Sequence, residues 1–222
     1  VSNSVRERFV VPPFIETIDL AKIDHSMAIV GGRGCGKTTY VRYFSHWTQF
    51  DKSRLEVDQS NLECIVLYWK PDTTYCRSMA QSWLSEHNAR MFFFFFSGLS
   101  LLKELISAIE NITHHFPGIN SDFIANKEFW ERISKISGTD LDEIGKVKTW
   151  IDDTLYDVQV SINANDIANL IRIDPQAMFS LLLPPIVNNI TLLNKTRFKV
   201  FIDEFENLAE YQQRIINGYR KH

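Results

Sequence analysis

A glycine-rich stretch near the N-terminus constrains the fold of this chain more than any other feature. The segment "IVGGRGCGKTTYVRYF" contains the pattern G-x-x-x-x-G-K-[ST], running from Gly31 to Thr38. An apolar run, "SMAIV", precedes the pattern and a helical pattern follows it, which is the strand–loop–helix context of a phosphate-binding loop. Glycine permits a loop whose backbone N–H groups point inward, and the following helix adds its positive N-terminal end. The sequence therefore predicts a nucleoside triphosphate site.

The residue types in this loop predict individual roles. Lys37 is expected to reach the β- and γ-phosphates and to act in catalysis, and the Thr38 hydroxyl is expected to ligate Mg²⁺. Two residues, Arg33 and Cys35, stand at variable positions, so neither receives a role of its own. The predicted nucleotide-binding residues are Gly31, Gly32, Arg33, Gly34, Cys35, Gly36, Lys37, Thr38 and Thr39.

A second candidate site element lies close to the end of the sequence. The apolar run "FKVFI" (198–202) predicts a buried strand that ends at Asp203 and Glu204. Ligands of parallel sheets bind at the carboxyl ends of the strands, so Asp203 is expected to hold the hydration shell of Mg²⁺. Glu204 is expected to orient or deprotonate the attacking water. An acidic pair after an apolar strand is weak on its own, but together with the phosphate loop it predicts an ATPase that uses ATP and Mg²⁺.

The coarse pattern along the chain predicts an α/β fold. Strands are predicted at residues 26–30, 63–69 and 198–202, and helices at 37–49, over most of 73–116, at 121–136 and 141–160, and from 174 onward with a kink or break at Pro184-Pro185. Strands separated by helices indicate a parallel sheet. We therefore predict the parallel sheet of a P-loop NTPase, incomplete in this chain, with a large helical insertion. The predicted division is 1–70 with 196–222 as the ATPase core, and 71–195 as the insertion.

The segment "RMFFFFFSGLSLLKE" is the most apolar part of the chain. Its apolar stretch, residues 91–102, lies between Arg90 and Lys103 and is interrupted by Ser97, Gly98 and Ser100. Spanning a bilayer requires about 18 or more apolar residues. The segment is therefore predicted to be buried and to lead into a core helix rather than to cross a membrane.

Composition narrows the choice of partners and compartment. Lys and Arg number 24 and Asp and Glu number 27, giving a formal net charge of −3. This balance gives no overall basic footprint for nucleic acid or for an anionic membrane, although it does not exclude a local patch. The three cysteines contain no CxxC pair, which predicts a reduced, cytoplasmic protein without a disulfide framework.

The finer resemblance is carried by two further segments. "DEFENLAEYQQRIIN" (203–217) resembles the Walker B segment of a bacterial group of AAA ATPases that is distantly related to origin-recognition proteins. "YWKPDT" (68–73) and the helical stretch at 83–104 resemble the second strand and insertion of the same group. The Asp-Glu pair is similar to that of the AAA, STAND, ABC and RecA-like branches, and the absence of an LSGGQ-like signature argues against an ABC-type head. Residues 113–195 contribute little to the resemblance.

The resemblance implies a function and some features of the fold. Members of the group often accompany effector genes, including antiviral defence systems, so it implies an AAA/STAND-like regulatory ATPase that couples nucleotide state to a protein effector or to a homo-oligomer. It also implies a sensor-bearing strand after Walker B. Because Asp203 lies 19 residues before the end, the sequence is expected to be a fragment or the ordered part of a longer protein. The general layout of such ATPases places adenine against residues 9–15.

Two other functions remain open from the sequence. One is a nucleotide-gated scaffold that binds ATP with little turnover and holds an effector inactive. The other is a DNA-loading or DNA-translocating ATPase, which the net charge of −3 counts against. The sequence does not choose between ATP and GTP.

Overall fold

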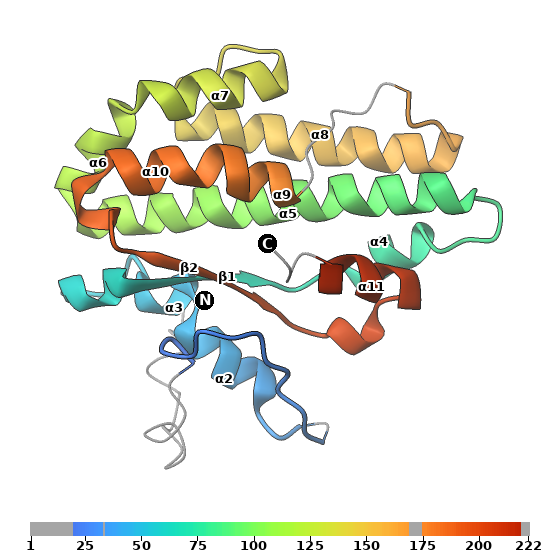
Figure 1. Ribbon diagram of the computed structural model, residues 1–222, viewed down its shortest axis with the longest axis horizontal. Coiled ribbons are helices and arrows are strands. Elements are labelled where there is room, and N and C mark those ends of the chain that lie inside the picture. The colour runs from blue at the N-terminus through green and yellow to red at the C-terminus, as the bar shows by residue number, and fades with distance from the viewer. Residues whose placement is uncertain (1–19, 33, 169–174, 219–222) are drawn as a thin grey trace.

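The computed structural model of the chain describes residues 20–32, 34–168 and 175–218 (Figure 1). It is a mostly helical α/β fold with a parallel sheet of two strands, β1 (Cys64–Trp69) and β2 (Arg197–Ile202). The helices are α2 (Lys37–Phe44), α3 (His46–Gln49), α4 (Thr73–Ser78), α5 (Glu86–His115), α6 (Pro117–Ile124), α7 (Lys127–Ser137), α8 (Ile144–Ala164), α9 (Pro175–Ala177), α10 (Leu183–Asn189) and α11 (Glu210–Gly218). Short 3-10 segments lie at η2 (Gln59–Glu63), η4 (Thr191–Leu193) and η5 (Phe205–Asn207), and a π-helical segment lies at η3 (Met178–Leu182).

The two strands form the sheet that positions the site. Their β-branched and aromatic residues suit a pleated, buried surface, and the predicted strands at 63–69 and 198–202 are confirmed. The strands pair in parallel, with Cys64 opposite Arg197 at one end and Trp69 opposite Ile202 at the other. Because the strands end at the same level, the residues that follow Trp69 and Ile202 emerge side by side.

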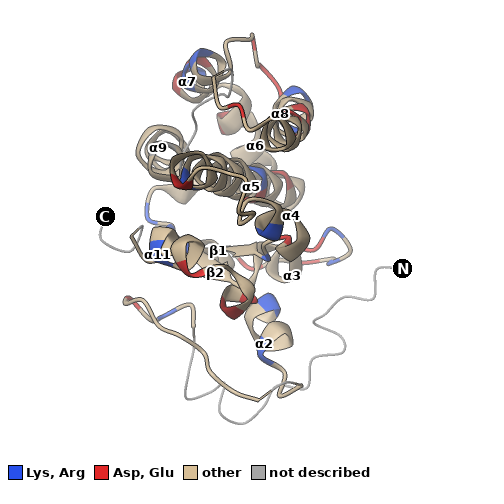
Figure 2. Ribbon diagram, turned by 90° about the vertical axis from the view of Figure 1, so that its right-hand side faces the viewer, with Lys and Arg blue, Asp and Glu red and all other residues tan. Residues whose placement is uncertain are grey.

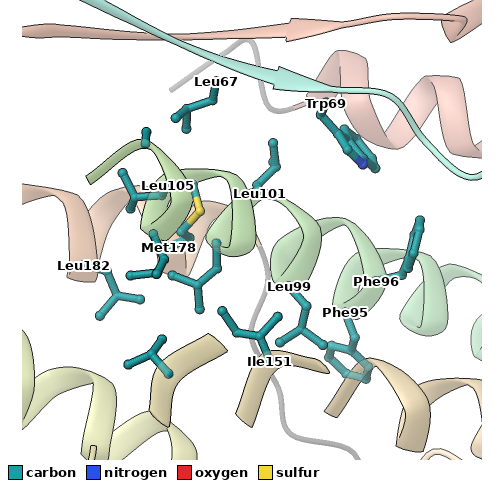
Figure 3. Close-up of a cluster of buried hydrophobic side chains, with 14 of the residues drawn as sticks. Leu67, Trp69, Phe95, Phe96, Leu99, Leu101, Leu105, Ile151, Met178 and Leu182 are labelled. Carbon is teal, nitrogen blue, oxygen red and sulfur yellow. The ribbon is translucent and has the colours of Figure 1, made fainter. Parts of the chain in front are cut away.

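The long helix α5 lies between the sheet and an outer layer of helices that includes α7, α8 and α10 (Figure 1). Leu67 and Trp69 point from β1 onto α5, and Ile151 of α8 packs from the other side (Figure 3). Burying an aliphatic side chain of this size contributes about 2 kcal/mol. The side chains labelled in this cluster are Leu67, Trp69, Phe95, Phe96, Leu99, Leu101, Leu105, Ile151, Met178 and Leu182.

Helix α5 is the one helix among the described residues that is long and apolar enough to cross a membrane. The fold buries 78% of its most apolar window. The prediction of a buried core helix for the phenylalanine-rich segment is therefore confirmed.

The opposite face of the sheet is covered by α2, so that the sheet lies between α2 and α5 (Figures 1 and 2). Successive side chains of a strand point to opposite faces. Leu67 and Trp69 face α5, whereas the ring of Tyr68 lies under the Arg42 guanidinium of α2, 5.9 Å from its Cζ atom. Alternation along β1 thus directs Tyr68 toward the side of the sheet that carries the phosphate loop.

The predicted strand at residues 26–30 is wrong. The segment has no regular secondary structure, and Met27 and Val30 are 42% and 88% exposed. A strand needs a neighbour to accept its backbone hydrogen bonds, and no described strand pairs with this segment. The apolar side chains of Met27 and Val30 therefore remain exposed instead of being buried in a sheet.

The chain just before this segment is nevertheless fixed to β2. The Lys199 ammonium donates to the carbonyl oxygens of Leu20, Ala21 and Ile23, at 3.2, 2.7 and 2.5 Å. An ion pair joins Arg197 to Asp24, with Nη1 2.5 Å from Oδ1. Alternate residues of β2 thereby anchor the turn that leads toward the phosphate loop.

Several predicted helices are interrupted. The helix expected at 37–49 breaks at Ser45, whose backbone is extended. The region 73–116 contains two helices, α4 and α5, because residues 79–85 are not helical. At Pro184-Pro185 the predicted break is not found: the helical run continues from residue 175 to 189 and changes from the π-helical η3 to α10 at residue 183. One continuous apolar cluster joins β1, α5 and α8, and the division at residue 71 stays a prediction.

Candidate nucleotide site

The glycine loop adopts backbone conformations that favour glycine. Gly34 and Gly36 have φ values of 82° and 87°, in the left-handed region where an L side chain is strained. Gly36 directly precedes α2, and its carbonyl accepts the Tyr40 N–H at 2.9 Å. The loop therefore delivers the N-terminal end of α2, with its free N–H groups, to the place where a phosphate would bind.

Lys37 folds back over this loop. Its ammonium donates to the carbonyl oxygens of Gly31 at 2.6 Å and Gly32 at 3.1 Å, and lies 3.8 Å from the Cys35 Sγ atom. These carbonyls hold the side chain along the loop rather than in solvent. Moving the ammonium onto a phosphate oxygen requires only exchange of these acceptors.

Thr38 and Asp203 meet although they lie 165 residues apart in the chain. The Thr38 hydroxyl donates to Asp203 Oδ2 at 2.9 Å. The Asp203 N–H continues the parallel ladder by donating to the Trp69 carbonyl at 3.0 Å, which fixes Asp203 at the carboxyl end of the sheet. The two predicted magnesium ligands are thus adjacent, as their roles require.

The Asp203 carboxylate has two further donors. The Tyr68 hydroxyl donates to Oδ2 at 2.6 Å, and the Glu204 backbone N–H donates to Oδ1 at 3.0 Å. Burial, and then the hydrogen bond to Asp203, raise the pKa of Tyr68, so the phenol keeps its proton and remains a donor. The carboxylate is consequently held in one orientation from three directions.

Glu204 lies next to Asp203 but points to a different partner. Its Oε1 atom forms an ion pair with the Lys70 ammonium at 2.7 Å, and its backbone has a φ of 55°. The hydrogen bond from Lys70 to Glu204 raises the pKa of Lys70, so this cation stays charged at neutral pH. Positive φ is uncommon for a residue other than glycine and marks a constrained position.

The structure thus brings together most of the predicted site. Lys37 and Thr38 of the loop lie at the end of the sheet that carries Asp203 and Glu204. Gly31, Gly32, Gly34, Cys35, Gly36 and Thr39 line an exposed loop and helix start. Arg33 and the adenine-contacting region proposed at residues 9–15 lie outside the described residues.

Two residues of the site, Tyr68 and Lys70, received no role from the sequence. Both belong to the end of β1, within the segment "YWKPDT", and the strand register places them beside Asp203 and Glu204. Carboxyl ends of neighbouring parallel strands meet at one edge of the sheet. The position of these polar residues at the end of the predicted 63–69 strand was therefore the sequence signal that could have identified them.

The ligand set suits Mg²⁺. This ion prefers hard oxygen ligands and is usually bound through one or two carboxylates together with phosphate oxygens and water. The Thr38 hydroxyl and the Asp203 carboxylate supply oxygens of this kind, and Lys37 supplies a cation for the phosphates.

Comparison with known proteins identifies the family. A family model described as ORC-CDC6-like matches residues 2–222. No curated protein and no solved structure matches the chain. The family match covers nearly the whole sequence, including the loop, both strands and the helical block between them. The chain therefore belongs to the ORC-CDC6-like family, and with it to the AAA+ P-loop ATPases.

Proposed function

We propose that this protein is a regulatory ATPase that binds and hydrolyses ATP with Mg²⁺ and couples its nucleotide state to a partner effector. The observation that carries the proposal is the 2.9 Å hydrogen bond between Thr38 and Asp203. It joins the phosphate loop to the acidic end of β2, as a phosphate-bound magnesium ion requires.

Each residue of the site has a defined task in this proposal. The backbone N–H groups of the loop and the N-terminal end of α2 bind phosphate oxygens. Lys37 leaves the carbonyls of Gly31 and Gly32 and neutralises the β- and γ-phosphates. Thr38 and Asp203 hold Mg²⁺, which when bound withdraws charge from the phosphate oxygens.

Glu204 orients and deprotonates the attacking water. A carboxylate that acts as general base must be within hydrogen-bond reach of that water. In the present arrangement it is paired with Lys70 instead. The ammonium occupies Oε1 and neutralises the carboxylate, so its release would make Glu204 a stronger base.

The partner in this proposal is a protein effector, with assembly of several copies as the second mode of coupling. Support comes from the resemblance of the 203–217 segment to ATPases that accompany effector genes, antiviral defence systems among them, and from membership of an AAA+ family. Change in the nucleotide site would reach the helical layer through β1, which packs directly on α5.

A second function, a nucleotide-gated scaffold with little turnover, is favoured by the Lys70–Glu204 ion pair. If this pair persists when ATP is bound, Lys70 keeps the charge of the general base neutralised and ATP acts as a structural ligand. ATP turnover by the wild-type protein therefore separates the regulatory ATPase from the scaffold.

The test combines binding and turnover. Binding of a fluorescent ATP analogue is measured for the wild type and Lys37→Ala, and ATP hydrolysis is measured for the wild type and Glu204→Gln, with and without neighbouring gene products. We expect Lys37→Ala to lose binding and Glu204→Gln to lose about 100-fold or more in turnover while still binding. Glu206→Gln is the matched control, because Glu206 is an exposed glutamate two residues away.

Three outcomes would change the assignment. Unimpaired binding by Lys37→Ala would defeat the phosphate site, and full turnover by Glu204→Gln would defeat the role of the glutamate. Tight binding by the wild type without turnover, even with partners present, would establish the scaffold instead.

A further inference from the structure

Tyr68 has a buried polar side chain that contacts a proposed magnesium ligand. The proposed reaction itself does not use this side chain. Tyr68 lies in β1 and is 9% exposed. Its hydroxyl donates to Asp203 Oδ2 at 2.6 Å, the same oxygen that accepts from Thr38. A phenol so placed acts on Asp203 and through it on the bound ion.

The hydrogen bond from Tyr68 reduces the number of open acceptor positions on the Asp203 carboxylate. A carboxylate has about four lone-pair positions on its two oxygens. Tyr68 and Thr38 fill those of Oδ2, and the Glu204 N–H takes one on Oδ1. Within the described residues, one position on Oδ1 is left without a protein donor.

The surroundings keep Tyr68 in this position. Alternation along β1 directs its ring to the α2 face, where the Arg42 guanidinium covers it at 5.9 Å. The neighbouring side chains, Leu67 and Trp69, are buried against α5, which prevents the strand from sliding or turning (Figure 3). The phenol is therefore a preformed donor rather than a mobile one.

We propose that Tyr68 is a positioning residue that leaves Asp203 a single open acceptor and thereby makes nucleotide binding selective for Mg²⁺ over Ca²⁺. Mg²⁺ gives up its waters reluctantly, so a fixed carboxylate with one open position suits a magnesium-bound water. Ca²⁺ takes more oxygen ligands in flexible geometry and profits from a carboxylate that is free to turn. This inference rests on the proposed function, because it concerns the same nucleotide site.

The experiment compares Tyr68→Phe with the wild type, using the full chain and a fluorescent ATP analogue. The analogue is titrated in EDTA, in Mg²⁺ and in Ca²⁺. We expect the Mg²⁺ concentration for half-maximal binding to rise about tenfold in Tyr68→Phe, since a hydrogen bond to a charged group is lost. The Ca²⁺ requirement should change less than about twofold, and binding in EDTA should be unchanged.

Tyr75→Phe is the matched control. Tyr75 is also a partly buried phenol with one hydrogen bond, to the Leu155 carbonyl at 3.0 Å. Its loss should leave the ratio of Mg²⁺ to Ca²⁺ requirements as in the wild type. If Tyr68→Phe does not fold, 3-fluorotyrosine at position 68 retains the shape and strengthens the donor, and should lower the Mg²⁺ requirement.

The outcomes separate this inference from the proposed function. If the wild type binds the analogue with Mg²⁺ and the metal ratio is unchanged in Tyr68→Phe, the role of Tyr68 is wrong and the nucleotide site stands. An equal loss with both metals would also overturn the inference, because it indicates general damage. If the wild type does not bind the analogue, both proposals fail.

Discussion

Two residues at the ends of neighbouring strands form an ion pair in the nucleotide site. Lys70 follows β1 and Glu204 follows β2, and their side chains form an ion pair at 2.7 Å. The Lys70 side chain is 51% exposed and the Glu204 side chain 33%. Exposed pairs of this kind are weak, so the contact can be exchanged for water when a substrate arrives.

We predict that Lys70→Met raises basal ATP turnover, by at most about fivefold, because it frees Glu204 at the cost of a weak ion pair. Steady-state hydrolysis at saturating ATP is the measurement. Lys146→Met is the control, since it breaks a similar exposed pair between Lys146 of α8 and Asp142, which precedes that helix. A fall in turnover would show that Lys70 assists the reaction rather than restraining the glutamate.

His46 illustrates how a buried residue links the segment after α2 to α5. Its ring is fully buried, with Nε2 3.0 Å from a Glu104 oxygen and Nδ1 3.2 Å from the Asn111 amide nitrogen. The amide nitrogen can only donate, so Nδ1 accepts and the ring is neutral with its proton on Nε2. Burial lowers the pKa of His46, against the raising influence of Glu104.

This shift predicts how stability depends on pH. The unfolded chain binds a proton at His46 below about pH 6.5, whereas the folded chain does so only at lower pH. The contribution of His46 to the free energy of unfolding is therefore complete above about pH 6.5 and is lost as the pH falls. We expect the melting temperature to drop between pH 7.5 and 5, and less steeply in His46→Gln than in the wild type or in the exposed-site control His87→Gln. Identical slopes in all three would contradict this.

At the residue scale, the sequence predicts the groups that belong to a contiguous pattern. Lys37 and Thr38 follow from the spacing of the loop, and Asp203 and Glu204 follow from their place after an apolar strand. Tyr68 and Lys70 depend on the register of two strands separated by the whole helical block, and no local pattern encodes that register.

At the scale of elements, α5 is the centre of the fold. It packs on β1 on one side and on α8 on the other (Figure 3). We predict that Leu105→Ala, at a fully buried position of α5, lowers the free energy of unfolding by about 3 kcal/mol through lost burial and a residual cavity.

Chemical denaturation followed by circular dichroism measures this effect. Val160→Ala is the control, because Val160 is 48% exposed on α8, and its change should stay within about 0.5 kcal/mol. Equal effects at the two positions would show that α5 is not the packing centre.

The elements also show where prediction from sequence stops. The strands at 63–69 and 198–202 have apolar patterns and each other as partners, and both form. The run at 26–30 has a similar pattern but no described neighbour, so it stays exposed, because a strand is stable only within a sheet. The π-helical turn at η3 is likewise absent from the pattern, since it arises where the helix approaches Pro184.

At the scale of the whole molecule, the distribution of charge bears on the class of partner. Basic and acidic residues are interspersed along α7 and α8 (Figure 2), and the formal net charge is −3. Non-specific DNA binding requires a basic surface that releases counterions from the phosphates. The described parts of α7 and α8 do not present a surface of this kind.

We predict that the isolated chain binds duplex DNA more weakly than a Kd of about 100 µM at 150 mM salt. Fluorescence anisotropy of a labelled 30-base-pair duplex, titrated with protein at several salt concentrations, is the measurement. Micromolar binding with a steep dependence on salt would instead support the DNA-loading function.

The contact between Thr38 and Asp203 has a consequence for the synthesis of the protein. The backbone hydrogen bonds within the helices between β1 and β2 are local and can form early, whereas joining residues 165 positions apart requires a long loop to close. At about 5–20 residues per second, a ribosome makes Asp203 roughly 10–30 s after Thr38. During that interval the phosphate loop exists without its acidic partner, so any contribution of Asp203 to binding under the proposed function is absent from the nascent chain.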